Sequence, residues 1–228
     1  MSKKNIPVKI NETYTLTIRD LGIHGEGIGA VDDFTVFVPG ALPGETIQAM
    51  IVTAKKSYAT GRLISIEVPS VHRTTPTCPV YRACGGCQIS HLTYEGQLDV
   101  KERRVKDVMV RIGGYEESLV RPIADATHPW NYRNKMAVPV SQVTSGPVMG
   151  YYRQGSHQVI PIASCAIQEE ENNRLLRFAQ GFMTRHQLTG YNEKTGRGSV
   201  RHIMGRVGDH GEVMAVIVTA TELSLIHI

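Results

Sequence analysis

The stretch Gly25-Glu26-Gly27-Ile28-Gly29, followed closely by Phe34-Thr35-Val36-Phe37-Val38, decides between two folds. Glycines at this spacing also occur in loops that bind nucleotide phosphates, but there a helix follows and its N-terminus holds the phosphate. Here a run of β-branched and aromatic residues follows, which is typical of a strand. We therefore interpret the glycines as a hairpin loop in a β-structure rather than as a nucleotide site.

Short apolar segments surround this hairpin from Thr13 to Ile66. Apolar residues recur with a period of two, and glycine or proline turns separate the segments. The apolar residues are Tyr14, Leu16 and Ile18, then Val36 and Val38, then Ile47, Ala49 and Ile51, and finally Leu63, Ile64 and Ile66. The pattern predicts a small antiparallel barrel of the OB type over residues 1–68.

The periodicity changes after residue 92. Leu98, Val105, Val108 and Ile112 recur at helical spacing before Gly113-Gly114, which predicts a helix over residues 94–112 whose apolar stripe packs over a central sheet. The other predicted elements are strands at 135–140, 148–153, 157–162, 199–207 and 213–219 and a helix at 169–185. The predicted fold class is α+β, with the barrel at 1–68, a cysteine-bearing loop at 69–92 and a mixed α+β domain at 93–220.

Composition limits the class of protein. A chain of 228 residues with 41% hydrophobic residues can form one large core or two small ones. No apolar run approaches the roughly 18 residues that a membrane span needs, and residues 1–10 lack a signal-peptide stretch, so we expect a cytoplasmic protein with no membrane partner. The formal net charge of +4 is too small by itself to indicate nucleic-acid binding.

Three of the four cysteines stand in the run Cys78-Pro79-Val80-Tyr81-Arg82-Ala83-Cys84-Gly85-Gly86-Cys87, and Cys165 follows far downstream. In a reducing compartment such cysteines are more often metal ligands or nucleophiles than disulfide partners. Three clustered thiolates and a remote fourth suit a four-coordinate sulfur site, and Gly85 and Gly86 let the loop bend around it. The spacing favours a cubane [4Fe-4S] cluster; a zinc site and four unrelated buried thiols are the alternatives.

These residues resemble a known family, the iron-sulfur RNA uracil-C5 methyltransferases, and most closely its bacterial 23S ribosomal RNA enzymes. The resemblance covers essentially the whole chain, and the barrel is similar to a TRAM domain. The segments that carry it are residues 21–27 and 38–45 of the barrel, the cysteine loop, Trp130-Asn131-Tyr132-Arg133-Asn134-Lys135-Met136, Gly150-Tyr151-Tyr152-Arg153, and Cys165.

The resemblance implies that Cys78, Cys84, Cys87 and Cys165 are the ligands of the cluster. In the family, a cysteine thiolate adds to the 6-carbon of uracil and S-adenosylmethionine methylates the 5-carbon, both within a C-terminal doubly wound domain. Four cysteines minus four ligands leave none to attack the ring. We therefore expect residues 221–228 to be a truncated end, the S-adenosylmethionine domain to be absent, and this polypeptide to be inactive, with no catalytic residue of its own.

Basic and aromatic residues indicate an RNA surface on each predicted domain. In the barrel the candidates are Lys55, Lys56, Tyr58 and Arg62, for which a solvated loop is the alternative interpretation. In the second domain Arg133 and Lys135 are stronger candidates, because the adjoining Trp130 and Tyr132 offer flat surfaces. The alternative there is a turn with Trp130 in the core. Further candidates are Arg153, Arg197, Arg201 and Arg206.

The expected partner is 23S ribosomal RNA, and the protein is expected to be a monomer. Two other interpretations stay open: a complete, non-catalytic iron-sulfur or zinc protein that binds RNA, and an electron-transfer protein.

Overall fold

The computed structural model describes residues 6–126 and 128–221 and divides into two compact units. The first unit contains the chain up to Thr75 and residues 88–125, and the second contains residues 76–87 and the chain from Ala126. The predicted division at residue 92 differs from this, because the cysteine loop belongs with the second unit and the predicted helix belongs with the first. In the described ranges, no helix combines the length and apolar character that crossing a membrane would require.

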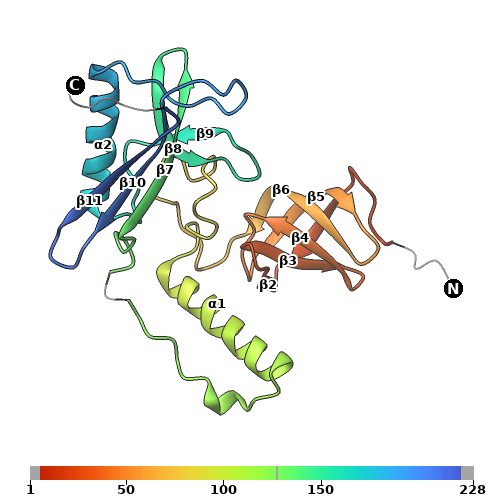
Figure 1. Cartoon of the computed structure of the whole chain (residues 1–228). Coiled ribbons are helices and arrows are strands. Elements are labelled where there is room, and N and C mark those ends of the chain that lie inside the picture. Colours follow the sequence, from red (N-terminus) through yellow and green to blue (C-terminus); the bar gives the residue numbers. More distant parts are fainter. Residues whose placement is uncertain (1–5, 127, 222–228) are drawn as a thin grey trace. The chain divides into compact units, whose positions relative to one another are not determined.

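The predicted barrel is present in the first unit (Figure 1). Its sheet has the order β1-β5-β6-β4-β3-β2, in which β4 and β6 are parallel and all other neighbours are antiparallel. The strands are β1 (Thr13–Thr17), β2 (Asp20–Leu21), β3 (Glu26–Val31), β4 (Phe34–Pro39), β5 (Thr46–Ala54) and β6 (Tyr58–Val68). Alternate residues point inward, and Leu16, Val36, Val38 and Ile47 form part of a fully buried core.

The glycines at 25–29 lie mainly within strand β3 rather than in the predicted hairpin loop. A Cβ on Gly27 would lie 2.8 Å from the carbonyl oxygen of Ala41, and one on Gly29 would lie 3.2 Å from that of Thr17. Glycine is therefore needed because other backbone segments approach β3 closely. The turn of the β3–β4 hairpin is formed instead by Asp32 and Asp33, whose φ angles of 46° and 61° suit a tight two-residue connection.

A fully buried carboxylate, Glu45, joins two segments of the first unit. Arg73 donates to both of its oxygens, with 2.8 Å between Nη2 and Oε2, and the backbone N–H groups of Leu42 and Ser70 donate over 2.8 and 3.2 Å. Burial opposes the charge, but the hydrogen bonds from Arg73, Leu42 and Ser70 outweigh it and lower the pKa of Glu45. Arg73 also donates to the carbonyl oxygen of Gly40 over 2.7 Å, so the pair fastens the chain after β6 to the chain after β4.

His91 is buried close enough to Arg73 and Glu45 to be affected by their charges. We therefore predict that the stability of the fold falls in acid. Burial and the charge of Arg73 lower the pKa of His91 from 6.5 to about 4, although Glu45 acts in the opposite direction. Because the folded pKa lies below the unfolded one, the stabilisation by neutral His91 is complete above pH 6.5 and is lost as pH falls towards 4. We expect this group to lower the free energy of unfolding by about 2 kcal/mol between about pH 7 and pH 5.

Urea unfolding of the whole chain, followed by circular dichroism at several pH values, checks this expectation. The His91→Leu variant should lose stability less steeply than the wild type over the same pH range. Equal slopes for the two proteins would show that His91 does not titrate as inferred.

The predicted helix over residues 94–112 is confirmed in extent. It comprises α1 (Tyr94–Asp107) and a π-helical turn, η1 (Val108–Ile112), and a short 3-10 helix, η2 (Glu117–Leu119), follows. The Thr93 side chain caps α1 by accepting from the N–H of Gly96. Val105 and Ile112 of its apolar stripe are 53% and 82% exposed, and the packing of this stripe over the central sheet stays a prediction.

The second unit is a five-stranded antiparallel sheet in the order β11-β10-β7-β8-β9, with a helix against it (Figure 1). The elements are β7 (Lys135–Val143), β8 (Gly146–Tyr152), β9 (Val159–Pro161), α2 (Glu170–Arg185), β10 (Val200–Val207) and β11 (Val213–Thr219). Every strand and helix predicted after residue 126 is therefore present. Together with the first unit they confirm a mixed α+β fold.

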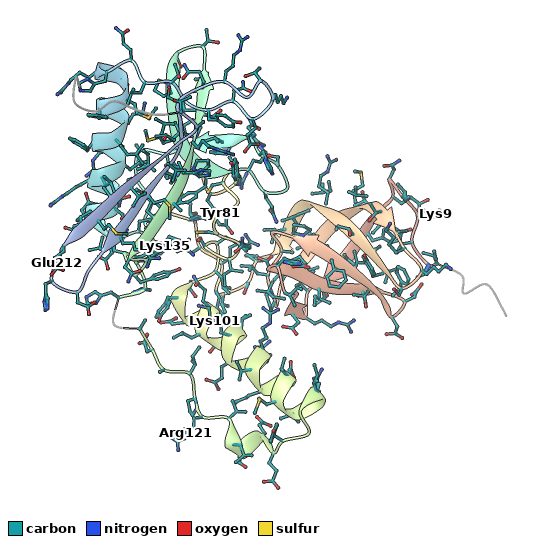
Figure 2. All side chains as sticks on the ribbon, in the orientation of Figure 1. Lys9, Tyr81, Lys101, Arg121, Lys135 and Glu212 are labelled. Atoms are coloured by element: carbon teal, nitrogen blue, oxygen red, sulfur yellow. The ribbon has the colours of Figure 1, made fainter. Side chains whose placement is uncertain are left out.

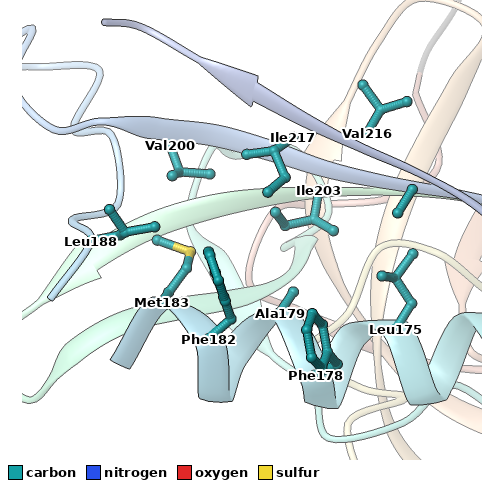
Figure 3. A pocket seen from close by; sticks show the side chains of 11 residues that line it. Leu175, Phe178, Ala179, Phe182, Met183, Leu188, Val200, Ile203, Val216 and Ile217 are labelled. Atoms are coloured by element: carbon teal, nitrogen blue, oxygen red, sulfur yellow. The ribbon is translucent and has the colours of Figure 1, made fainter. Parts of the chain in front are cut away.

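Apolar side chains join α2 to the sheet. Figure 3 shows Phe182 and Met183 on the face of α2 that is turned towards Ile203 and Ile217 of the strands. An apolar cavity of about 100 Å³ remains between the helix and β10–β11. β11 is an edge strand with partly exposed apolar residues, including 39% exposure at Ile217, so this edge is less completely covered than the rest of the core.

Candidate metal centre and nucleic-acid interface

The cysteine loop is fixed against the end of strand β8. The N–H of Gly85 donates to the carbonyl oxygen of Tyr152 over 2.9 Å, and Cys84 forms an isolated β-bridge with Arg153. A Cβ on Gly85 would lie 3.0 Å from both Tyr152 O and Gln154 N. Gly85 therefore lets the loop run directly along the end of β8, where a side chain would not fit. This is a second reason for glycine, besides the bending of the loop predicted from the sequence.

Cys165 is held by the first turns of α2. Its backbone N–H donates to Oδ1 of Asn173 over 2.8 Å, and Nδ2 of Asn173 donates back to the carbonyl oxygen of Cys165 over 3.3 Å. Asn173 is only 3% exposed, so its amide has few other conformations available. The fourth predicted ligand therefore has a defined backbone position.

The fold brings Cys165 into the neighbourhood of the cysteine loop. All four cysteines are described and partly buried, and none forms a disulfide. The pKa of the Cys84 thiol is raised, chiefly by burial and also by the negative charges of Cys78 and Cys165, although the Gly86 N–H, 3.4 Å from its Sγ, acts to lower it. Burial and the charge of Cys165 likewise raise the pKa of Tyr151 to about 12. Cys78 and Cys165 therefore both lie close enough to Cys84 to act on it electrostatically.

The donor set suits a thiophilic centre, but the side chains are not arranged as a coordination shell. Among the residues that the structure describes, no group of three or more His, Cys, Asp or Glu side chains is placed so that it could hold a metal ion. The chemistry still fits, because thiolates are the ligands of iron-sulfur clusters and of structural zinc. The N–H directed at Sγ of Cys84 is of the kind that stabilises charge on a cluster-bound sulfur.

The predicted RNA residues of the barrel lie on the β5–β6 hairpin and on β6. Lys55 and Lys56 form the exposed turn, which the hydrogen bond from the Lys55 N–H to the Tyr58 carbonyl closes over 2.8 Å. Tyr58 is 40% exposed and meets Phe37 edge to face, with ring centroids 5.6 Å apart, while Arg62 is exposed further along β6. The fold therefore adds Phe37, which the sequence pattern did not single out, to this basic and aromatic surface.

The second set of candidates forms an exposed segment before and at the start of β7. Trp130 and Tyr132 are 41% and 60% exposed, so the alternative with Trp130 in the core is wrong. Arg133 has an exposed side chain on a fixed backbone, since its N–H donates to Ile167 O over 2.8 Å. Lys135, labelled in Figure 2, is exposed and faces exposed Arg206 in the β7–β10 register. Like charges directly opposite one another are unfavourable unless an anion lies near, so this pair suits a phosphate.

Arg153 and Arg201 occupy different surroundings in the second unit. Arg153 lies at the cysteine loop through its bridge to Cys84, whereas the Arg201 guanidinium lies over the ring of Tyr191, 4.5 Å from its centroid. Both side chains are exposed. The structure therefore places Arg153 at the candidate metal centre and Arg201 beside an aromatic group that the sequence pattern did not mark.

Residues 7–64 match the family model described as the TRAM domain. The barrel of the first unit is a TRAM domain. This confirms the predicted resemblance for this part of the chain, with bounds close to the predicted 1–68.

Two curated relatives extend the similarity to the second unit. An uncharacterized RNA methyltransferase of Bacillus cereus is 44% identical over 221 residues, which are 96% of this chain and 48% of that protein. One from Halalkalibacterium halodurans is 40% identical over 223 residues, which are 97% of this chain and 49% of that protein. The chain therefore spans about half the length of the curated relatives it matches.

A solved structure shares the fold. The tRNA (uracil-54, C5)-methyltransferase of Pyrococcus abyssi, in complex with S-adenosyl-L-homocysteine, matches with a TM-score of 0.67 and 22% sequence identity. The match covers 92% of this chain and 47% of the other. The fold of the TRAM domain and the second unit therefore also occurs within an enzyme of known structure.

Proposed function

We propose that this chain is the RNA-binding and cluster-bearing portion of an RNA uracil-C5 methyltransferase, which in the whole enzyme forms 5-methyluridine from S-adenosylmethionine. The names of the relatives and the shared fold support the RNA methyltransferase class. The observation that carries the RNA part is the exposed segment Trp130 to Lys135, in which two aromatic and two basic side chains lie close together along a fixed backbone. We propose 23S ribosomal RNA as the substrate.

In this proposal the two units bind RNA through different groups. The TRAM domain follows the RNA backbone with Lys55, Lys56 and Arg62 while Tyr58 stacks on a base. In the second unit, Arg133 donates two parallel hydrogen bonds to a phosphate or base edge, and Lys135 with Arg206 binds another phosphate. The exposed rings of Trp130 and Tyr132 provide stacking surfaces for unpaired bases. These contacts hold a single-stranded segment without acting on it chemically.

Cys78, Cys84, Cys87 and Cys165 would hold a [4Fe-4S] cluster. Such a centre supplies a covalent cross-link between the cysteine loop and the chain before α2. Its function is then structural, since it fixes the loop that Gly85 and Arg153 already place at the end of β8. Zinc bound by the same four thiolates would provide a similar cross-link.

Methyl transfer is proposed for the whole enzyme rather than for these residues alone. Uracil-C5 chemistry needs a thiolate that adds to the ring, and the four cysteines of this chain are all assigned to the cluster. We therefore expect the 228-residue chain to bind RNA without methylating it. The inactivity stays a prediction, which incubation with labelled S-adenosylmethionine and the RNA tests directly.

RNA binding by the whole chain should depend strongly on salt. We expect log affinity for a 23S ribosomal RNA transcript to fall linearly with log salt concentration, because each bound phosphate releases counterions. Arg133→Gln should weaken binding and flatten the slope by about one, since one phosphate contact is lost. Filter binding at several salt concentrations measures both quantities.

The matched control is Arg174→Gln, which removes an exposed arginine of α2 that pairs with Glu171. It should leave the slope unchanged. Binding that does not vary with salt would contradict the proposed RNA function. Equal affinity for a transfer RNA would contradict the choice of 23S ribosomal RNA and leave the RNA-binding proposal intact.

A further inference from the structure

A polar cleft of about 480 Å³ opens in the second unit. Residues of β7, of the β8–β9 hairpin, of the chain at 191–194 and of β10 line it. These elements come from distant parts of the sequence, and the lining includes Arg201, a predicted RNA-binding residue, and Tyr152 of the segment Gly150-Tyr151-Tyr152-Arg153. The cleft has the size of a small-molecule site rather than of a packing defect.

Two pairs of flat side chains line this cleft. The rings of Tyr152 and His157 stack with centroids 5.1 Å apart and an interplanar angle of 27°. The guanidinium of Arg201 lies over the ring of Tyr191 at 4.5 Å. Aromatic rings and arginine planes are the surfaces on which proteins stack unpaired nucleobases. The cleft therefore offers stacking surfaces of the type that a base requires.

A carboxylate stands between these groups. Oε2 of Glu193 lies 2.7 Å from Nδ1 of His157, and Oε1 accepts from the Tyr152 hydroxyl over 3.3 Å. The hydrogen bond from His157 is the main reason that the pKa of Glu193 is lowered, so the side chain is ionised and only accepts hydrogen bonds. Each carboxylate oxygen can accept from more than one donor. Glu193 is half-exposed and thus has capacity left for a ligand.

The backbone around Glu193 is held in place. The side chain of Asn192 accepts from the N–H groups of Lys194 and Thr195 over 2.9 and 3.1 Å, and its backbone N–H donates to Arg197 O over 2.7 Å. A fixed negative charge weakens the binding of phosphates to nearby Arg201. On an RNA-binding surface such a charge is useful where it accepts hydrogen bonds from a base.

We propose that this cleft binds one unpaired guanine of the RNA, whose N1–H and N2–H groups donate to Glu193 while its ring stacks on the flat side chains of the lining. This deepens the proposed RNA-binding function and rests on it. Guanine fits because its Watson–Crick edge carries two neighbouring donors, which match the two oxygens of a carboxylate. Adenine and cytosine offer one amino group there, and the single N3–H of uracil lies between two carbonyl oxygens that Glu193 would repel. Lys194, which also lines the cleft, then attracts an adjoining phosphate.

The test measures binding of the whole chain to short uridine-rich oligonucleotides that carry one central guanosine, inosine or adenosine. We expect the guanosine oligonucleotide to bind at least about tenfold more tightly than the other two, because inosine lacks the N2 amino group and adenosine lacks both donors. In Glu193→Gln the preference should vanish. The matched control Glu212→Gln, which removes an exposed carboxylate of the β10–β11 hairpin, should keep it.

Equal affinity of the wild-type protein for the three oligonucleotides would overturn the proposal, as would a guanine preference that survives in Glu193→Gln. The inosine comparison needs no variant, so it decides the matter even if the substituted protein does not fold. A chain that binds the ribosomal transcript in a salt-dependent way but shows no base preference would refute the cleft alone. A chain that binds neither RNA would refute the proposed function itself.

Discussion

Anaerobically purified protein is expected to contain iron and sulfide, and Cys84→Ser or Cys165→Ser should each lower the iron content at least about tenfold. The reason is geometric as well as chemical. Cys84 lies in a loop fixed to the end of β8, and Cys165 is held by Asn173 of α2. When serine replaces either of them, no other thiol can move in to take its place as a ligand. Quantifying iron, sulfide and zinc in the same samples provides the measurement.

Ser164→Ala is the matched control, because Ser164 is exposed and precedes Cys165 directly. It should keep the iron content of the wild type. Stoichiometric zinc without sulfide would show that the four-thiol site binds zinc rather than an iron-sulfur cluster. A folded protein that takes up neither metal under reconstitution would contradict the site as a whole.

The Glu45→Gln variant should be less stable than the wild type by about 3 to 5 kcal/mol, since it leaves the Arg73 guanidinium without its buried counter-ion. Glu45 is 0% exposed and accepts from Arg73, Leu42 and Ser70, so a glutamine amide cannot satisfy the same three donors. Urea unfolding of the whole chain, followed by circular dichroism, measures the change. The lost free energy of unfolding should be that of the TRAM domain, because Glu45 lies in it.

Glu67→Gln provides the comparison within the same barrel, because Glu67 is exposed and accepts only from the half-buried Gln48 among the contacts described. Its stability should stay within about 0.5 kcal/mol of the wild type. A loss below about 1 kcal/mol for Glu45→Gln would show that the buried pair contributes little.

The sequence by itself determined the elements and their order. Alternation marked the strands of the barrel, because this period records which side of a strand faces an apolar environment, and helical spacing marked the helix around Val105. The run from Cys78 to Cys87 predicted a sulfur site, which stays a prediction. The same local patterns predicted the barrel, and the resemblance carried by residues 21–27 and 38–45 indicated a TRAM domain, which residues 7–64 match.

Only the tertiary structure decided which distant residues meet. It placed the backbone of Thr17 against Gly29 and the side chain of His157 on Glu193, neither of which the residue pattern predicted. A local period shows that one face of a strand or helix is apolar, but it does not show which segment covers that face. Contacts between distant segments depend on strand register and on the close approach of backbones, and these are set by the folded chain as a whole.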